Sequence, residues 1–218
     1  MRLYLKLSKN TDPVPFEHNS VLAGIFHKWV NDAEIHDSLS LYSFSWLRGG
    51  GVNNNNLDFP KGGYWFISIY DSETLMKIIK QIQINPNIAY GMTVKEVVIF
   101  ETPEFSSEQR FMLATPIFIK RTMDKKSIHY LYFDNESDKL MTETLKTKLK
   151  KAGINDESLK ISFDRSYDKA KVKLISYKGI KNKANLCPVI ITGKPETLAF
   201  AWNVGIGNST GIGFGALL

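Results

Sequence analysis

The sequence predicts an α+β protein built from two tandem ferredoxin-like domains packed side by side. The chain has 218 residues, enough for two domains of about 100 residues each. Apolar residues make up 43% of it, which is sufficient for a substantial core. Period-two and helical apolar patterns follow one another in the order β-α-β-β-α-β, the ferredoxin-like unit. We place the domains at residues 1–105 and 106–218.

The first half carries this pattern more clearly. RLYLKL, residues 2–7, alternates apolar and polar side chains and predicts the opening strand. Asp71 or Ser72 can cap the second helix. The segment GGGVNNNN, residues 49–56, consists of turn formers and indicates a flexible loop. The remaining elements are helices over 18–31 and 72–83 and strands over 40–46, 63–70 and 93–100.

The second half repeats the unit less regularly. A turn at Asp164–Asp168 is expected to join the strands at 160–163 and 171–177 into a hairpin. Pro195 suits the first position of a helix. The predicted helices cover 136–151 and 195–204, and the predicted strands cover 110–120 (interrupted by Pro116), 128–133, 160–163, 171–177, 185–193 and 213–218.

Charge is distributed unevenly between the halves. Residues 1–110 carry 10 Lys+Arg and 12 Asp+Glu, a net charge of −2, whereas residues 111–218 carry 18 and 10, a net charge of +8. One reading is a solvated lysine-rich face. The other is a surface that binds a polyanion, since clustered cations release counterions from phosphate. Six lysines fall within fifteen residues: Lys169, Lys171, Lys173, Lys178, Lys181 and Lys183.

Cysteine content and hydropathy narrow the class of protein. The single cysteine, Cys187, excludes an internal disulfide framework and fits the cytoplasm. We expect no membrane association, because no apolar run approaches the roughly 18 residues that a membrane span needs. Asn208-Ser209-Thr210 matches a glycosylation sequon, which we interpret as coincidence without a secretory signal.

The closing residues, VGIGNSTGIGFGALL (204–218), contain five glycines. A P-loop is excluded because no Lys-Ser or Lys-Thr pair follows the glycines. A dinucleotide fingerprint is excluded because no helix follows them. Two readings remain: a sheet-edge turn with bulges, or bare backbone N–H groups against which a sugar-phosphate chain can lie.

The same closing segment resembles the glycine loop of the RAMP superfamily of CRISPR-associated RNA-binding proteins, V-G-x-G-x-x-x-x-G-x-G-x-G, here Val204 to Gly215. MRLYLKL, the stretch Pro15 to Asn19 before a helix with Gly24-Ile25-Phe26, and Thr115-Pro116-Ile117 extend the similarity over the whole chain. Together they resemble the CRISPR repeat-cleaving endoribonucleases, the Cas-six family. The resemblance implies two ferredoxin-like domains and metal-independent cleavage of precursor CRISPR RNA, leaving 2′,3′-cyclic phosphate and 5′-hydroxyl ends.

Four histidines are candidates for proton transfer near neutral pH: His18, His27, His36 and His129. At about 100° per residue, His18 falls within the apolar stripe of the first helix and is expected to pack or cap. His27 falls on the polar face and is expected to point outward. His36 lies nine residues further on, so the two rings can converge only if the chain bends near residues 31–35.

The resemblance gives these residues roles. His36 occupies the place of the family's catalytic histidine, and His27 matches a second active residue in the first helix. The family's lysine before the second strand has no counterpart, and Ser40 stands there. Lys28, Arg48 or a protonated second histidine can then supply positive charge to the transition state. No cofactor and no metal site are expected.

RNA contacts are expected in two regions. The glycine loop is predicted to lie against the RNA backbone through Gly205, Gly207, Asn208, Ser209, Gly211 and Gly213. The basic half is predicted to bind phosphates through Arg165, Lys169, Lys171 and Lys173 on the candidate hairpin, with Arg48 as a further contact. Tyr42, Trp46 and Tyr64 can stack on bases, although strand aromatics are more often buried.

Two further classes of function stay open beside the nuclease. One is a non-catalytic RAMP subunit that binds RNA in a CRISPR effector complex, which the missing lysine favours. The other is a ferredoxin-like protein that binds a small molecule. The partners expected are CRISPR repeat RNA, effector-complex subunits and a second copy of the chain.

Overall fold

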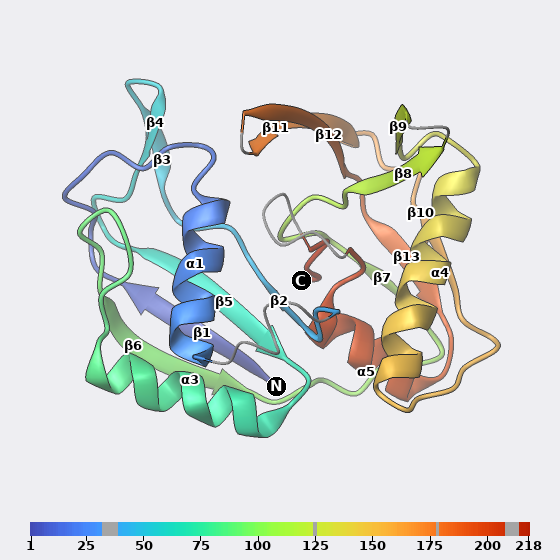
Figure 1. Cartoon of the computed structure of the whole chain (residues 1–218), viewed down its shortest axis with the longest axis horizontal. Coiled ribbons are helices and arrows are strands. Elements are labelled where there is room, and N and C mark those ends of the chain that lie inside the picture. Colours follow the sequence, from blue (N-terminus) through green and yellow to red (C-terminus); the bar gives the residue numbers. More distant parts are fainter. Residues whose placement is uncertain (32–38, 124–125, 178, 208–213) are drawn as a thin grey trace.

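The computed structural model describes residues 1–31, 39–123, 126–177, 179–207 and 214–218. Its first half forms a four-stranded antiparallel sheet with the strand order β2-β5-β1-β6. This confirms the β-α-β-β-α-β prediction for the first half, and helices α1 and α3 pack against each other beside this sheet (Figure 1). The elements are β1 (Arg2–Leu7), α1 (Asn19–Val30), β2 (Tyr42–Phe44), β5 (Gly63–Ile69), α3 (Ser72–Ile84) and β6 (Val94–Phe100).

Simple side-chain patterns form these elements. Leu3, Leu5 and Leu7 alternate along β1 and are buried beneath the helices. The side chain of Asp71 accepts hydrogen bonds from the backbone N–H groups of Glu73 and Thr74, which caps α3 as expected. The apolar patterns therefore bury one face of the sheet against α1 and α3.

The segment at 49–56 is not the loop that the sequence suggested. Strands β3 (Gly51–Asn53) and β4 (Asn56–Asp58) form a two-stranded hairpin there. The two residues between the strands, Asn54 and Asn55, have φ angles of 46° and 60°. Asparagine tolerates this left-handed region, and two such residues make the tight turn that matches strand twist. The asparagines thus favour a hairpin.

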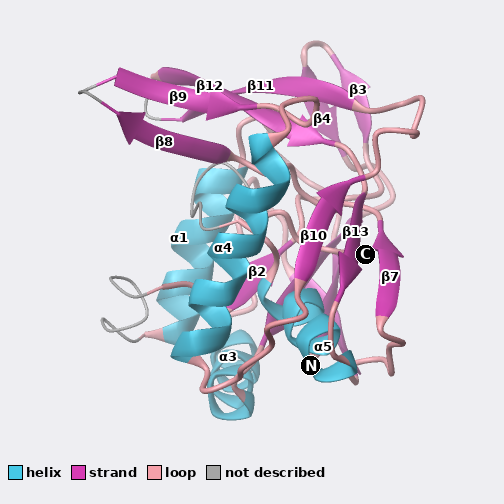
Figure 2. Ribbon diagram, turned by 90° about the vertical axis from the view of Figure 1, so that its right-hand side faces the viewer, coloured by secondary structure: helices cyan, strands magenta, loops and turns pink. Residues whose placement is uncertain are grey.

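The second half builds its sheet from β10, β13 and β7, in that order. Helix α4 lies between β7 and β10 in sequence, and α5 follows β13, so the ferredoxin-like order recurs. The hairpins β8–β9 and β11–β12 are additions to it, and they form a layer at one end of the molecule (Figure 2). The elements are β7 (Glu108–Phe111), β8 (Ile119–Met123), β9 (Lys126–Tyr130), α4 (Glu136–Lys151), β10 (Lys160–Phe163), β11 (Lys171–Tyr177), β12 (Ile180–Leu186), β13 (Val189–Thr192) and α5 (Pro195–Val204).

Several strand predictions in this half were wrong. The stretch 110–120 forms parts of two strands, β7 and β8, which belong to different sheets on either side of Pro116. β10 pairs with β13, and β11 pairs with β12, so the predicted hairpin of 160–163 with 171–177 does not exist. The predicted closing strand is reduced to two bridges, Phe214 with Ile117 and Leu217 with Leu113.

Two hydrophobic clusters make up most of the core, one in each half. The end of the chain joins them, because Phe214 packs in the first cluster and Leu217 in the second. Arg2 of β1 is buried and donates hydrogen bonds to the carbonyl oxygens of Trp202 and Leu217, at 3.1 and 2.8 Å. The domain boundary at residue 105 stays a proposal; it falls between β6 and β7.

Candidate functional site

The last turn of α1 and the start of β2 bring His27 and Tyr42 together. A hydrogen bond of 3.3 Å joins Tyr42 Oη and His27 Nε2, and the two rings meet edge-on with centroids 6.0 Å apart. Tyr42 also stacks on Phe26, with centroids 4.1 Å apart. His27 is therefore half-buried against Tyr42, and the expectation that it points freely outward was wrong.

The Tyr42 hydroxyl lies between His27 and Ser40. Burial raises the pKa of Tyr42, and a hydrogen bond with Ser40 opposes part of this rise. The phenol therefore stays protonated at neutral pH and can hold the imidazole through a neutral hydrogen bond. Ser40 itself is buried, which places its hydroxyl inside this contact and away from solvent.

The predicted partner of His27, His36, lies in segment 32–38, outside the described residues. The helix before it ends where the prediction needs a bend. Asn31 follows α1 in the left-handed conformation, with φ 49° and ψ 44°, and its N–H bonds to the His27 carbonyl oxygen. Left-handed asparagine is a common helix terminator. The chain therefore changes direction at residue 31.

The other end of that segment is held by a residue that sequence reasoning missed. Lys151, in the last turn of α4, donates from Nζ to the Leu39 carbonyl oxygen at 3.2 Å. Leu39, Tyr42 and Lys151 also line one cavity of about 210 Å³, together with Leu41, Ile69, Asp71 and Thr74. The second half thus brings an ammonium group next to Ser40. Lys28 and Arg48, the cations named from sequence, are exposed on α1 and beside β5.

The base of the glycine-rich segment is closed by its own backbone. Gly207 N–H donates to the Phe214 carbonyl oxygen at 2.6 Å, and Ile206 N–H donates to that of Gly215 at 3.2 Å. Gly205 has φ 66°, and a Cβ there would lie 2.6 Å from the Phe214 carbonyl oxygen. Gly205 and Gly207 are buried, so the prediction that they form an open floor for RNA was wrong. Asn208, Ser209, Gly211 and Gly213 lie outside the described residues.

A buried lysine fixes this base from below. Lys148 of α4 is fully buried, and its Nζ donates to the carbonyl oxygens of Val204, Gly205 and Gly207 at 2.9, 3.2 and 2.7 Å. Burial lowers the pKa of Lys148 to about 7. These carbonyls lie at the C-terminal end of α5, where the helix dipole favours positive charge. Lys148 and Lys151 therefore hold the flanks of two candidate segments from one helix.

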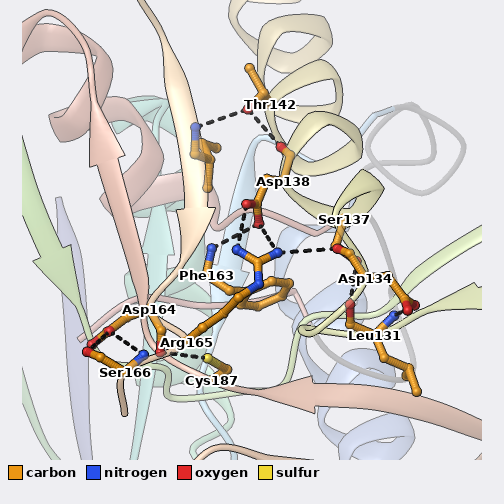
Figure 3. Close-up of polar contacts among 11 residues, drawn as sticks. Leu131, Asp134, Ser137, Asp138, Thr142, Phe163, Asp164, Arg165, Ser166 and Cys187 are labelled. Carbon is orange, nitrogen blue, oxygen red and sulfur yellow. Dashed lines mark hydrogen bonds and ion pairs between the residues drawn. The ribbon is translucent and has the colours of Figure 1, made fainter.

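The basic residues predicted to bind phosphate divide into two groups. Arg165 makes two hydrogen bonds to the Asp138 carboxylate, at 2.7 and 3.1 Å, and one to the Asp134 carbonyl oxygen (Figure 3). Its guanidinium therefore anchors the 164–168 turn to α4. Lys169 and Lys171 are exposed and open to a ligand. Lys173 lies over the Trp46 ring, 4.2 Å from its centroid, and burial lowers its pKa.

The aromatic candidates for base stacking also divide. Tyr42 is buried, and Trp46 is half-buried under Lys173. Tyr64 is 49% exposed on β5 and is available for stacking. His18 is buried as expected, because its Nδ1 lies 2.9 Å from the Pro15 carbonyl oxygen and its Nε2 accepts from Leu47 N–H.

Neither a metal cluster nor a membrane span is found in the part of the chain that the structure describes. No three His, Cys, Asp or Glu side chains there gather as metal ligands. Each described helix is too short or too polar to cross a bilayer.

Comparison with known proteins gives both a family and a fold. The family model described as "CRISPR associated protein Cas6, C-terminal" matches residues 100–217. No curated protein matches the sequence. The chain is covered completely by three solved structures that resemble it. One is described as "CRISPR associated protein Cas6", with a TM-score of 0.83, 17% identity and 98% of that chain covered.

The second structure is described as "Characterization of a Cas6-related gene from Pyrococcus furiosus" and has a TM-score of 0.85 at 18% identity, with 97% of its chain covered. The third, "An RAMP protein binding different RNA substrates", has a TM-score of 0.84 at 20% identity, with 98% covered. At such low identity these likenesses show the fold, which is the predicted tandem ferredoxin-like arrangement.

Proposed function

The chain belongs to the Cas6 family of CRISPR-associated proteins, and on this basis we propose that it binds CRISPR repeat RNA and cleaves it as a sequence-specific endoribonuclease. The net charge of +8 on residues 111–218 supports binding to a polyanion. A structural relative described as a RAMP protein binding different RNA substrates supports RNA as that polyanion. The proposed substrate is the repeat of precursor CRISPR RNA.

The proposed reaction is an internal transesterification that uses acid–base groups without a metal. The 2′-oxygen forms a bond to the adjacent phosphorus while the bond from phosphorus to the 5′-oxygen breaks. A base takes the 2′-hydroxyl proton, and an acid gives a proton to the departing 5′-oxygen. The products are a 2′,3′-cyclic phosphate and a 5′-hydroxyl. Each positioned acid or base contributes about 10²- to 10⁴-fold to such a rate.

The contact between His27 and Tyr42 carries the assignment of this chemistry. It orients one imidazole at the end of α1, five residues from the segment that contains His36. We assign His36 and His27 as the two proton-transfer groups, with Tyr42 and Ser40 as positioning residues. A pentacoordinate phosphorane also needs positive charge. Lys151 is the cation next to Ser40, and Lys28 lies beside His27 in sequence.

A non-catalytic RNA-binding subunit of an effector complex is the second candidate. The buried position of Ser40 favours it, because a serine hydroxyl enclosed beside Tyr42 cannot give a phosphorane the charge of a lysine. In this reading the basic half binds RNA, and the remaining surface contacts other subunits.

Cleavage of end-labelled repeat RNA in EDTA separates the two candidates. We expect cyclic-phosphate products from the unaltered protein. We expect His36→Ala and His27→Ala each to slow single-turnover cleavage by about 10²- to 10⁴-fold with RNA affinity retained. His129→Ala is the matched control, because this histidine lies on β9 in the other half.

Tight binding of intact RNA by the unaltered protein would establish the subunit instead. Loss of cleavage in EDTA alone, restored by a divalent cation, would contradict the acid–base mechanism. A bell-shaped pH profile of cleavage that loses one limb in each histidine variant would separate the acid from the base.

A further inference from the structure

The four-stranded sheet of the first half ends at β6 with an apolar strand. β6 pairs with β1 along one edge, and among the described strands none pairs with the other. Three consecutive residues in its second half, Val98, Ile99 and Phe100, are 39%, 51% and 49% exposed. In the register with β1, Val98 and Phe100 lie opposite Tyr4 and Arg2, and Ile99 lies opposite Leu3. Apolar side chains are therefore exposed on both faces of this edge.

An edge of this kind is unusual in a protein that stays monomeric. Natural sheets protect their edges with proline, bulges or charged residues in the middle of the strand. In β6 the residues 97–100 are Val, Val, Ile and Phe, without proline or charge, and the charges stand at 95, 96 and 101. The irregularity that β6 does contain lies at its start, opposite Lys6 and Leu7. The exposed half of the strand is left regular and free to pair (Figure 1).

The charge pattern of β6 selects the occupant of this edge. We propose that β6 pairs antiparallel with β6 of a second copy of this chain, with the two-fold axis at Val98. In this register Lys95 of each copy faces Glu101 of the other, and Val97 faces Ile99. Opposite charges and apolar pairs placed directly across from each other stabilise antiparallel strands. A shift of the axis to Val97 places Lys95 opposite Ile99, and a shift to Ile99 places Glu101 opposite Val97, so only the Val98 register matches charge with charge.

The dimer leaves the candidate site accessible. β2, which carries Tyr42, is the opposite end strand of the same sheet, so pairing through β6 joins the two sheets into one and keeps β2 at both outer ends. The proposal therefore does not depend on whether the protein cleaves RNA.

Sedimentation equilibrium over a series of protein concentrations tests the dimer. We expect a monomer–dimer equilibrium for the unaltered protein. Val98→Asp places like charges opposite each other at the axis and is expected to weaken dimerisation by at least about tenfold. Val52→Asp, at a 70% exposed position of β3, is the matched control and leaves the dimer unchanged. A monomer at every concentration, or a dimer unaffected by Val98→Asp, would overturn the proposal.

Charge reversal tests the register without altering the apolar centre. Lys95→Glu and Glu101→Lys each create two like-charge pairs and are expected to weaken the dimer, whereas the double variant restores the pairing and the affinity. A double variant as weak as its parents contradicts the Val98 register. Circular dichroism of each variant separates loss of the dimer from loss of the fold. Val98→Cys is also expected to form an intermolecular disulfide on oxidation, because the native Cys187 is buried.

Discussion

Two regions flank the segments named for function, and α4 holds them in different ways. Leu39, after residues 32–38, receives one hydrogen bond from the exposed Lys151. Val204, Gly205 and Gly207, before residues 208–213, receive three from the fully buried Lys148. A buried donor shared by three carbonyls resists water and thermal motion far better than one exposed contact. The base of the glycine-rich segment is therefore a structural joint, while the exit of the histidine segment is lightly tethered.

Removal of the buried ammonium is the strongest test of this difference. Lys148→Met leaves three enclosed carbonyl oxygens without their donor, and we expect a loss of about 2–4 kcal/mol in the free energy of unfolding. Lys150→Met, at an exposed position two residues away, is the control and is expected to change stability by less than about 0.5 kcal/mol. Urea denaturation of both variants measures the effect. Equal stability of the two variants would show that the carbonyls bind water as readily as Lys148.

The pH dependence of the same variant isolates the charge. The unfolded chain keeps the lysine proton up to about 10.5, whereas the folded protein releases it at about 7. Between these values the unfolded state binds more protons, so the contribution of Lys148 to stability rises with pH by about 1.4 kcal/mol per unit. Below pH 7 both states hold the proton and the contribution is constant. The difference in unfolding free energy between the unaltered protein and Lys148→Met, measured from pH 6 to 9.5 at about half-unit steps, is expected to show this slope.

Much of this architecture could be predicted from local pattern, and the joint itself could not. Amphipathic runs and caps such as Asp71 and Pro195 place helices α3, α4 and α5 within one residue of the prediction. Strand partners in the second half depend on contacts between distant residues, so β11 was assigned to β10 although it pairs with β12. Lys148 was taken as part of a lysine-rich helix. Its place on the stripe of Met141, Leu145 and Leu149 was the signal that it is buried.

The glycines provide a second test, with opposite signs at two sites. Gly205→Ala puts a Cβ against the Phe214 carbonyl oxygen at a positive φ, and we expect a loss of about 2–4 kcal/mol. Gly24→Ala lies in α1 with no atom within 4 Å of the new Cβ, and we expect a gain of about 0.5–1 kcal/mol. Thermal unfolding of both variants measures the difference. A neutral Gly205→Ala would mean that the base of the segment can open.

The lightly tethered region is expected to show its effect in rate and little in stability. Lys151→Ala removes one exposed hydrogen bond to Leu39, so the free energy of unfolding is expected to fall by less than about 0.5 kcal/mol. If Lys151 supplies charge to the phosphorane, single-turnover cleavage is expected to slow by about tenfold or more.

Lys151→Arg keeps the charge and is expected to recover part of the rate, while Lys150→Ala serves as the matched control on the same turn of α4. RNA affinity, measured beside the rate, separates the two possible contributions of the ammonium group. A lower affinity with an unchanged rate of bound RNA would assign Lys151 to phosphate binding, since charge used only in the transition state changes the chemical step and leaves the ground-state complex intact.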